Sequence, residues 1–136
     1  MKNLSGTILM APFGFFGSGR KDPPEDDGKT VKAAVRNISA KEAKAIMDEG
    51  KPYTLLDVRT SGEFGEGHIK GAKLIPVDEV EFRAPKELPD KNAVILVYCA
   101  SGARSARASK ILAKMGYVNV NNFGGIMNWP YETAGG

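Results

Sequence analysis

Residues Ala93–Ser105 read AVILVYCASGARS, and this stretch decides both the fold class and the place of the candidate site. Ala93–Tyr98 is a continuous apolar run without alternation, which is typical of a strand buried on both faces of a parallel sheet. The small residues after it lead into Ala103–Met115, which we predict to be a helix. The candidate core positions of that helix are Ala106, Ile111, Leu112 and Met115. Cys99 therefore lies between a buried strand and a helix.

Shorter elements alternate along the rest of the domain. Ser39–Glu42 has the pattern of a capping box, and Gly50 stands where the helix that it opens would end. Further strands are predicted at 53–58, 73–76 and 118–120, and a last helix is expected to begin within 125–129. This alternation predicts an α/β fold, a small open parallel sheet with helices on both faces.

The chain is expected to divide at about residue 36. Residues 1–35 contain a short apolar stretch, Ile8–Phe16, and then a polar linker rich in Pro and Gly, and we interpret them as a flexible N-terminal extension before one domain over 36–136. The apolar stretch is too short to cross a bilayer, which needs about 20 apolar residues. A cytoplasmic protein is expected from the free thiol; the alternative is export, if residues 1–19 act as a weak signal peptide.

Composition excludes several function classes. The formal charge is +3 without a Lys/Arg block, which does not favour nucleic acid as a partner. The chain has one Cys and one His, so an internal disulfide, a CxxC redox pair and a Cys/His zinc site are excluded. We expect no metal and no organic cofactor.

Cys99 is the candidate nucleophile. Ligands of open parallel sheets bind beyond the carboxyl ends of the strands, where Cys99 falls. The short residues that follow can curl into a nest of backbone N–H groups at a helix N-terminus, which stabilises an anion and lowers a thiol pKa from about 8.5. The alternative is that Cys99 is a small buried hydrophobe. The predicted cradle consists of Ala100, Ser101, Gly102, Ala103, Arg104 and Ser105.

Three further polar residues, Asp57, Arg59 and His68, are candidates for support of the site, and Arg104 of the cradle has two possible roles. Arg104 either holds a substrate oxyanion or braces the loop against a carboxylate. Asp57, at a strand end, is expected to accept hydrogen bonds from backbone amides and fix a loop. Arg59 lines the pocket mouth or pairs with a surface carboxylate, and His68 is expected to tie a loop by hydrogen bonds rather than to act in catalysis.

The residues after the long strand resemble the active loop of the rhodanese family, in which a Cys is followed by small residues, Gly and Arg-Ser. Cys99, Gly102, Arg104 and Ser105 match that pattern. The other blocks that resemble the family are 57–59 with 63–64, 67–72, 116–120, and 124–126 with Trp129. The resemblance runs from about Ile38 to Trp129 and implies a rhodanese-like sulfurtransferase.

The resemblance implies covalent catalysis in two half-reactions. The Cys99 thiolate would take the outer sulfur of a donor such as thiosulfate and become a persulfide; cyanide or a thiol would then remove that sulfur. Two details depart from the family pattern. Ala100 stands where many relatives place a cation or a large polar residue, which would make thiosulfate a poor donor, and Pro130 follows Trp129.

Three alternative functions remain at this point. A cysteine phosphatase or arsenate reductase also uses a Cys-to-Arg anion loop, but similar phosphatases have five intervening residues and this chain has four, Ala100 to Ala103. A binding module without chemistry usually lacks the cysteine. A persulfide carrier would hand sulfur to a partner protein and needs the same Cys99. The expected partners are small-molecule sulfur donors and acceptors, with a sulfur-accepting protein as a further candidate.

Overall fold

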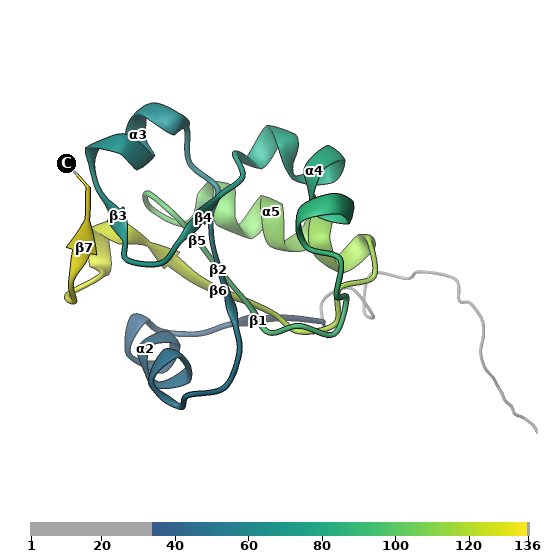
Figure 1. The fold of residues 1–136 in the computed structure, drawn as a ribbon, viewed down its shortest axis with the longest axis horizontal. Coiled ribbons are helices and arrows are strands. Elements are labelled where there is room, and N and C mark those ends of the chain that lie inside the picture. The colour runs from purple at the N-terminus through teal and green to yellow at the C-terminus, as the bar shows by residue number, and fades with distance from the viewer. Residues whose placement is uncertain (1–33, 136) are drawn as a thin grey trace, which may run out of the picture. The chain divides into compact units, whose positions relative to one another are not determined.

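The structure is a computed structural model that describes residues 34–135. Its main sheet has five parallel strands in the order β1-β6-β5-β2-β4 (Figure 1). The strands are β1 (Val35–Asn37), β2 (Thr54–Asp57), β4 (Lys73–Leu74), β5 (Ile95–Cys99) and β6 (Val120–Gly125). The predictions for the N-terminal extension and the signal segment fall mostly on residues outside this range.

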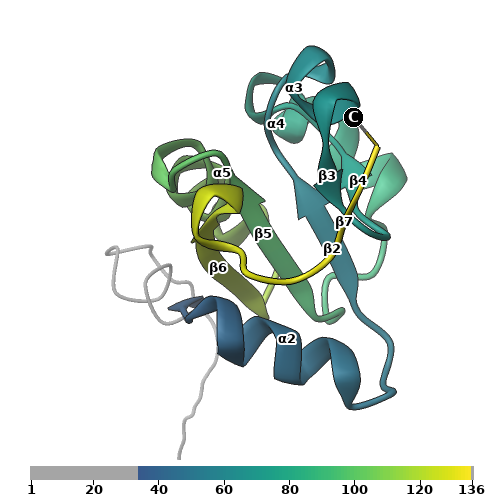
Figure 2. The same cartoon turned by 90° about the vertical axis from the view of Figure 1, so that its left-hand side faces the viewer.

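Helices cover both faces of the sheet, as predicted. Helix α2 (Ala40–Asp48) lies on one side of the strands, whereas α4 (Val80–Glu87) and α5 (Ala103–Lys114) lie on the other (Figures 1 and 2). Each side has its own apolar core: Leu55 and Leu96 face the α2 side, and Leu56 and Val97 face α4 and α5. Successive residues of these strands therefore point into opposite apolar cores. Because both faces of the strands are buried, their sequence shows no alternation of apolar and polar residues.

Shorter elements close the ends of the sheet. They are α3 (Ser61–Glu66), the 3₁₀ turns η1 (Val77–Glu79) and η2 (Ile126–Asn128), and an antiparallel pair of β3 (His68–Ile69) with β7 (Thr133–Ala134). None of the helices within residues 34–135 is long and apolar enough to cross a membrane.

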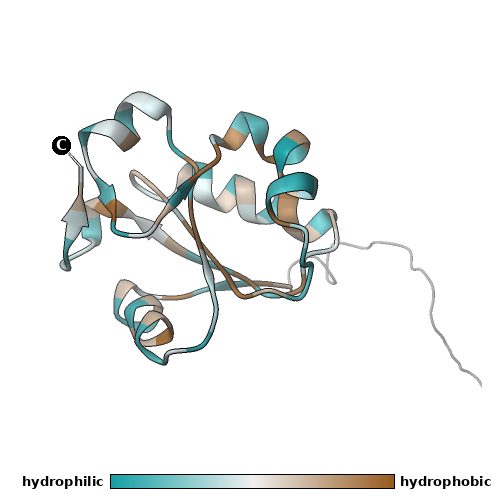
Figure 3. Ribbon diagram, viewed as in Figure 1, coloured by the Kyte–Doolittle hydropathy of each residue, from teal (hydrophilic) through white to brown (hydrophobic). Residues whose placement is uncertain are grey.

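The central strand confirms the prediction made from the apolar run. All five residues of β5 are buried, and it pairs with β2 on one side and β6 on the other. The hydropathy colouring shows apolar segments along the inner strands (Figure 3). The capping box is also present: Ser39 accepts from the Glu42 amide and Glu42 accepts from the Ser39 amide.

Three details of the sequence prediction were wrong. A short strand was expected at 118–120, but β6 begins at Val120 and continues to Gly125. The expected final helix is one 3₁₀ turn, because Trp129 precedes Pro130 and has an extended backbone. Ala106 is exposed on α5, since the helix turns its small residues Ala108 and Ser109 to the core instead.

Candidate active site

Cys99 is the last residue of β5, and its side chain is held at the point where the strand turns toward α5. It is 1% exposed. The backbone N–H of Gly102 donates a hydrogen bond to Cys99 Sγ at 3.0 Å. The thiol therefore sits inside the turn and accepts from its backbone, which is the geometry expected of an anion cradle.

Two glycines give the loop its shape. Gly102 has φ +118°, a conformation that side chains other than that of Gly rarely adopt. Gly125 lies against the loop from β6: a Cβ there would overlap the carbonyl oxygen of Ala100. Two residues after Gly125, the N–H of Met127 donates to that carbonyl at 3.2 Å. The end of β6 therefore supports the Cys99 loop through direct backbone contact.

The pKa of the Cys99 thiol is lowered by its surroundings. Burial raises it, but hydrogen bonds from the Ser105 hydroxyl and from the amides of Ser105, Gly102 and Ser101 stabilise the thiolate more. Of the six residues predicted to form the cradle, Gly102 is the one whose hydrogen bond to the sulfur is seen directly among the described residues. The arrangement favours a thiolate without a neighbouring general base.

Ser105 links the loop to β6. Its hydroxyl carries one proton, and three acceptors lie within reach: Asn122 Oδ1 at 2.8 Å, Gly102 O at 3.0 Å and Gly124 O at 3.3 Å. Asn122 Oδ1 also accepts from the Gly124 amide at 3.0 Å. These contacts fix the Ser105 hydroxyl between the Cys99 loop and β6.

Arg104 braces the loop against a carboxylate. Its Nη1 and Nη2 donate to Glu63 Oε1 and Oε2 at 2.8 and 2.9 Å, which is a bidentate pair between α5 and α3. Glu63 is also the capping-box residue of α3, where its Oε1 accepts from the Thr60 amide at 3.0 Å. The Arg104 guanidinium and the Thr60 amide lower the Glu63 pKa to about 2. Between the two roles left open for Arg104, the structure shows the brace.

A second arginine pair lies buried beside the loop. Asp57 is fully buried and Arg59 nearly so, and their side chains meet at 2.8 Å. Asp57 Oδ1 also accepts from the Arg59 amide at 2.9 Å, and Arg59 Nη2 donates to Gly67 O. The carboxylate that pairs with Arg59 is thus a buried one, not a surface one. The pair ties the end of β2 to the segment that follows α3.

His68 makes its contacts with Phe64. Its ring stacks on Phe64, with ring centroids 3.7 Å apart, and its Nδ1 lies 2.8 Å from Phe64 O. A carbonyl can only accept, so Nδ1 carries the hydrogen in this contact. The residue packs and ties the segment between α3 and β3.

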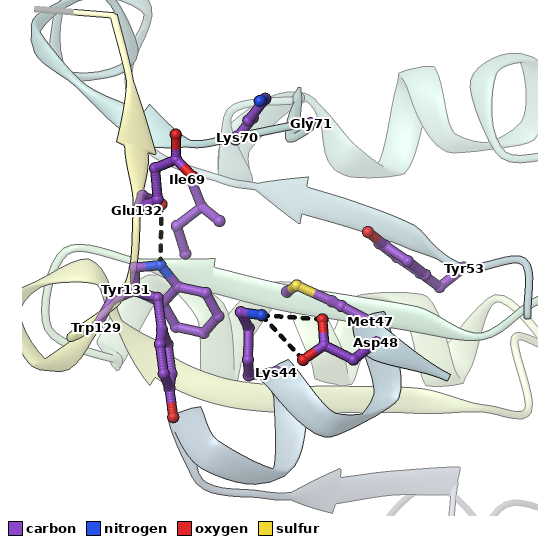
Figure 4. A pocket seen from close by; sticks show the side chains of 10 residues that line it. All are labelled: Lys44, Met47, Asp48, Tyr53, Ile69, Lys70, Gly71, Trp129, Tyr131 and Glu132. Carbon is purple, nitrogen blue, oxygen red and sulfur yellow. Dashed lines mark hydrogen bonds and ion pairs between the residues drawn. The ribbon is translucent and has the colours of Figure 1, made fainter. Parts of the chain in front are cut away.

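A separate hollow of about 380 Å³ opens on the α2 side (Figure 4). Trp129 and Tyr131 stand at one end and Tyr53 at the other, with the Lys44–Asp48 ion pair along α2 between them. None of the Cys99 loop residues lines it. Trp129 is packed on Phe123, so it belongs to the apolar core as much as to the hollow.

Two residues of the site were missed from the sequence. Glu63 could have been found as the fourth residue of a second capping-box pattern, Thr60–Glu63, although its pairing with Arg104 spans 41 positions. Asn122 carried no signal, because a polar residue in a short Asn-rich segment reads as a turn. Within residues 34–135, no group of three or more His, Cys, Asp or Glu side chains could hold a metal ion.

Comparison with known proteins gives consistent matches over this region. A family model described as Rhodanese-like domain matches residues 39–131. The thiosulfate sulfurtransferase PspE of Escherichia coli (strain K12) is 42% identical over 71 residues, which cover 52% of this chain and 68% of the relative. The putative sulfur carrier protein YrkF of Bacillus subtilis (strain 168) is 35% identical over 102 residues, which cover 74% of this chain and 54% of the relative. Among solved structures, a rhodanese with anions from E. coli superposes with a TM-score of 0.59 at 36% identity and covers 62% of this chain and 100% of that one.

Proposed function

This chain belongs to the rhodanese-like domain family, and from that premise we propose that it is a sulfurtransferase that moves sulfane sulfur through a persulfide on Cys99. The observation that carries the proposal is the cradle: the chain's one cysteine ends the central strand, accepts from the Gly102 amide and has a lowered pKa. Relatives named as thiosulfate sulfurtransferases support the reaction class.

The first half-reaction is nucleophilic substitution at sulfur. The Cys99 thiolate attacks the outer sulfur of thiosulfate; a new S–S bond forms as the old one breaks, and sulfite leaves with the bonding electron pair. No proton moves in this step, so no general base is needed. The Cys99 persulfide that results is an anion, and the amides of the loop stabilise it as they stabilise the thiolate.

The second half-reaction returns the enzyme to its starting state. Cyanide or a thiolate attacks the outer sulfur of the Cys99 persulfide, and the Cys99 thiolate leaves. The product is thiocyanate or an acceptor persulfide. Because the two substrates never meet, the kinetics should follow a ping-pong pattern.

A persulfide carrier is the second candidate, and the relative named as a putative sulfur carrier favours it. The carrier differs from the enzyme in the acceptor, which would be a protein thiol. High turnover with cyanide supports the enzyme, whereas slow turnover with rapid transfer to a protein thiol supports the carrier.

The deciding measurement is the intact mass of the reduced protein after incubation with thiosulfate or with an organic hydropersulfide. We expect a gain of one sulfur atom, reversed by cyanide. Cys99→Ser is the matched control, since the chain then contains no thiol, and it should gain nothing. No gain in the folded wild-type protein with either donor would contradict the proposal.

A further inference from the structure

The Ser105 hydroxyl has one hydrogen and three acceptors within reach. Asn122 Oδ1, Gly102 O and Gly124 O lie 2.8, 3.0 and 3.3 Å from Ser105 Oγ. The Ser105 side chain is fully buried, so bulk water offers it no further partner. A hydroxyl donates one hydrogen bond, and its hydrogen rotates to suit the surroundings. The oxygen is therefore fixed, while the hydrogen serves one acceptor at a time.

The Asn122 side chain is held with its oxygen toward Ser105. Asn122 Oδ1 accepts from the Gly124 amide at 3.0 Å, and a backbone N–H can only donate, so this contact sets the orientation of the side-chain amide. Asn122 Nδ2 then donates to Asn37 Oδ1 at 3.2 Å, on β1. Asn122 thus presents an acceptor to the Ser105 hydroxyl, and that acceptor is the nearest of the three.

The Cys99 sulfur draws on the same hydrogen. Burial raises the pKa of the Cys99 thiol, and the Ser105 hydroxyl is the first of the groups that lower it below its ordinary value. A thiolate is a charged and strong acceptor, whereas the sulfur of a neutral thiol accepts only weakly. The sulfur therefore attracts the Ser105 hydrogen when Cys99 is ionised and scarcely at all when it is not.

We propose that Asn122 is a positioning residue for Cys99, whose Oδ1 competes with the sulfur for the Ser105 hydrogen and so limits how far the thiolate is stabilised. Beside the neutral thiol, the Ser105 hydroxyl donates to Asn122; beside the thiolate, it turns and donates to Cys99. The stabilisation that the sulfur gains is reduced by the hydrogen bond that Asn122 loses. Asn122 Oδ1 keeps the Gly124 amide in both states, so the turn leaves no buried acceptor unsatisfied.

This inference deepens the proposed sulfurtransferase function and rests on it for its part in catalysis. A less stabilised thiolate attacks sulfur better, whereas a more stabilised thiolate is the better leaving group. Cys99 has to act in both ways, because it attacks the donor in one half-reaction and leaves the persulfide in the other. The Ser105 hydrogen would face the sulfur while the negative charge is on Sγ, and would return to Asn122 once the charge is on the outer sulfur of the persulfide.

The charged groups around Cys99 are left alone by the test. They are Arg104 of α5, which pairs with Glu63 of α3, and the buried pair of Asp57 and Arg59 at the end of β2. Each variant below exchanges one uncharged side chain for another. A shift in the ionisation of Cys99 would therefore come from hydrogen bonding and not from an added or removed charge.

The test is the rate of alkylation by iodoacetamide against pH, in the wild type, Asn122→Leu, Ser105→Ala and the double variant. Leu keeps the branched shape of Asn but offers no acceptor, so more of the Ser105 hydrogen is left for the sulfur. We expect the pH midpoint of Asn122→Leu to be lower by about 0.5–1 unit. Its plateau rate above the midpoint should fall about two- to threefold, because the nucleophilicity of a thiolate falls with its pKa. In the Ser105→Ala background, Asn122→Leu should change neither value.

Asn37→Leu is the matched control. It removes the other partner of the Asn122 amide but leaves Oδ1 with Ser105 and Gly124, so the midpoint and the plateau should stay at the wild-type values. If Asn122 only held the loop in shape, its loss would raise the midpoint toward that of an ordinary thiol. A midpoint that rises or stays in place in folded Asn122→Leu overturns the proposal, as does a fall of the same size in the Ser105→Ala background.

Alkylation needs no sulfur transfer, so the two proposals fail separately. A Cys99 that takes up no sulfur refutes the sulfurtransferase function, whereas the alkylation profiles decide the competition for the Ser105 hydrogen. If Asn122→Leu does not fold, nuclear magnetic resonance of the wild type and Ser105→Ala decides. The side-chain amide signals of Asn122 should shift with the midpoint of Cys99 in the wild type, and this shift should be lost in Ser105→Ala. Signals that do not shift, or that shift equally in both proteins, overturn the proposal.

Discussion

Gly125 and Ala100 meet backbone to backbone where β6 ends beside the Cys99 loop. A Cβ added to Gly125 would overlap the Ala100 carbonyl oxygen and would lie 2.6 Å from the Ala100 carbonyl carbon and from Ser101 Cα. The overlapping atoms all belong to backbone, so no side-chain rotation can relieve the clash. The position of Cys99 thus depends on the absence of a side chain on a different strand.

The first prediction follows from this contact. Gly125→Ala should push the loop away from β6, destabilise the domain by about 1–3 kcal/mol and slow the alkylation of Cys99 by iodoacetamide. Urea unfolding and the alkylation rate at neutral pH measure the two effects. Gly65→Ala is the control, since Gly65 is in α3 with nothing within 4 Å of an added Cβ, and should be neutral or slightly stabilising. An unchanged alkylation rate in Gly125→Ala would contradict the expected displacement.

The second prediction concerns the thiolate. Ser105→Ala removes the hydroxyl that helps to lower the Cys99 pKa, so the midpoint of alkylation against pH should move upward, toward that of an ordinary thiol. The same substitution removes one of the two donors to Asn122 Oδ1, which keeps the Gly124 amide, so a loss of stability of about 0.5–1.5 kcal/mol is expected. Ser61→Ala, at the exposed start of α3, should leave the midpoint in place. A midpoint that does not move would show that the amides alone stabilise the thiolate.

The third prediction is a dependence of stability on pH. The Glu63 pKa is lower in the folded protein than its ordinary value of 4.5, so its stabilising contribution is complete above about pH 4.5 and is lost as pH falls toward 2. Because the side chain is about one-third exposed, solvent screening reduces the contribution to about 1 kcal/mol. Glu63→Gln should therefore be less stable than the wild type at pH 7, and the difference should shrink as pH approaches 2. Urea titrations across this range measure it, and a difference independent of pH would argue against the ion pair.

The fourth prediction separates a buried ion pair from an exposed one. Asp57→Asn leaves Arg59 charged and buried without its partner, which should cost about 3–5 kcal/mol of unfolding free energy. Asp48→Asn breaks the exposed pair with Lys44 and should cost less than about 1 kcal/mol. Similar losses in the two variants would mean that Arg59 finds another acceptor; Gly67 O, to which it already donates, is the first candidate.

Much of the fold was predictable because its signals are local. The strand β5 and the helix that starts at Ser39 can each be predicted from a few consecutive residues, the apolar run and the capping box. Cys99 could be placed for the same reason, since the strand, the loop and the helix around it are contiguous.

The parts that could not be predicted depend on contacts between distant segments. In β6, Asn121 and Asn122 are buried because their amides bond to Ile95 O and Asn37 Oδ1, partners that only the assembled sheet supplies. Arg104 had two open roles because a sequence does not show which carboxylate will lie opposite it. In the structure, the carboxylate opposite Arg104 is that of Glu63, which lies 41 positions away in the sequence.

The burial of Cys99 has a consequence for the lifetime of the persulfide proposed to form there. A sulfur atom attached to Sγ would extend the side chain by about 2 Å, so the reactive end begins from a site that is 1% exposed. Peroxide and other thiols in bulk water would rarely reach the outer sulfur of the persulfide. A folded protein acceptor would need to insert a narrow, extended segment to reach that sulfur. On the proposed function, the loop would hold the bound sulfur as well as react through it, and the rate of transfer would depend on how far the acceptor can reach into the loop.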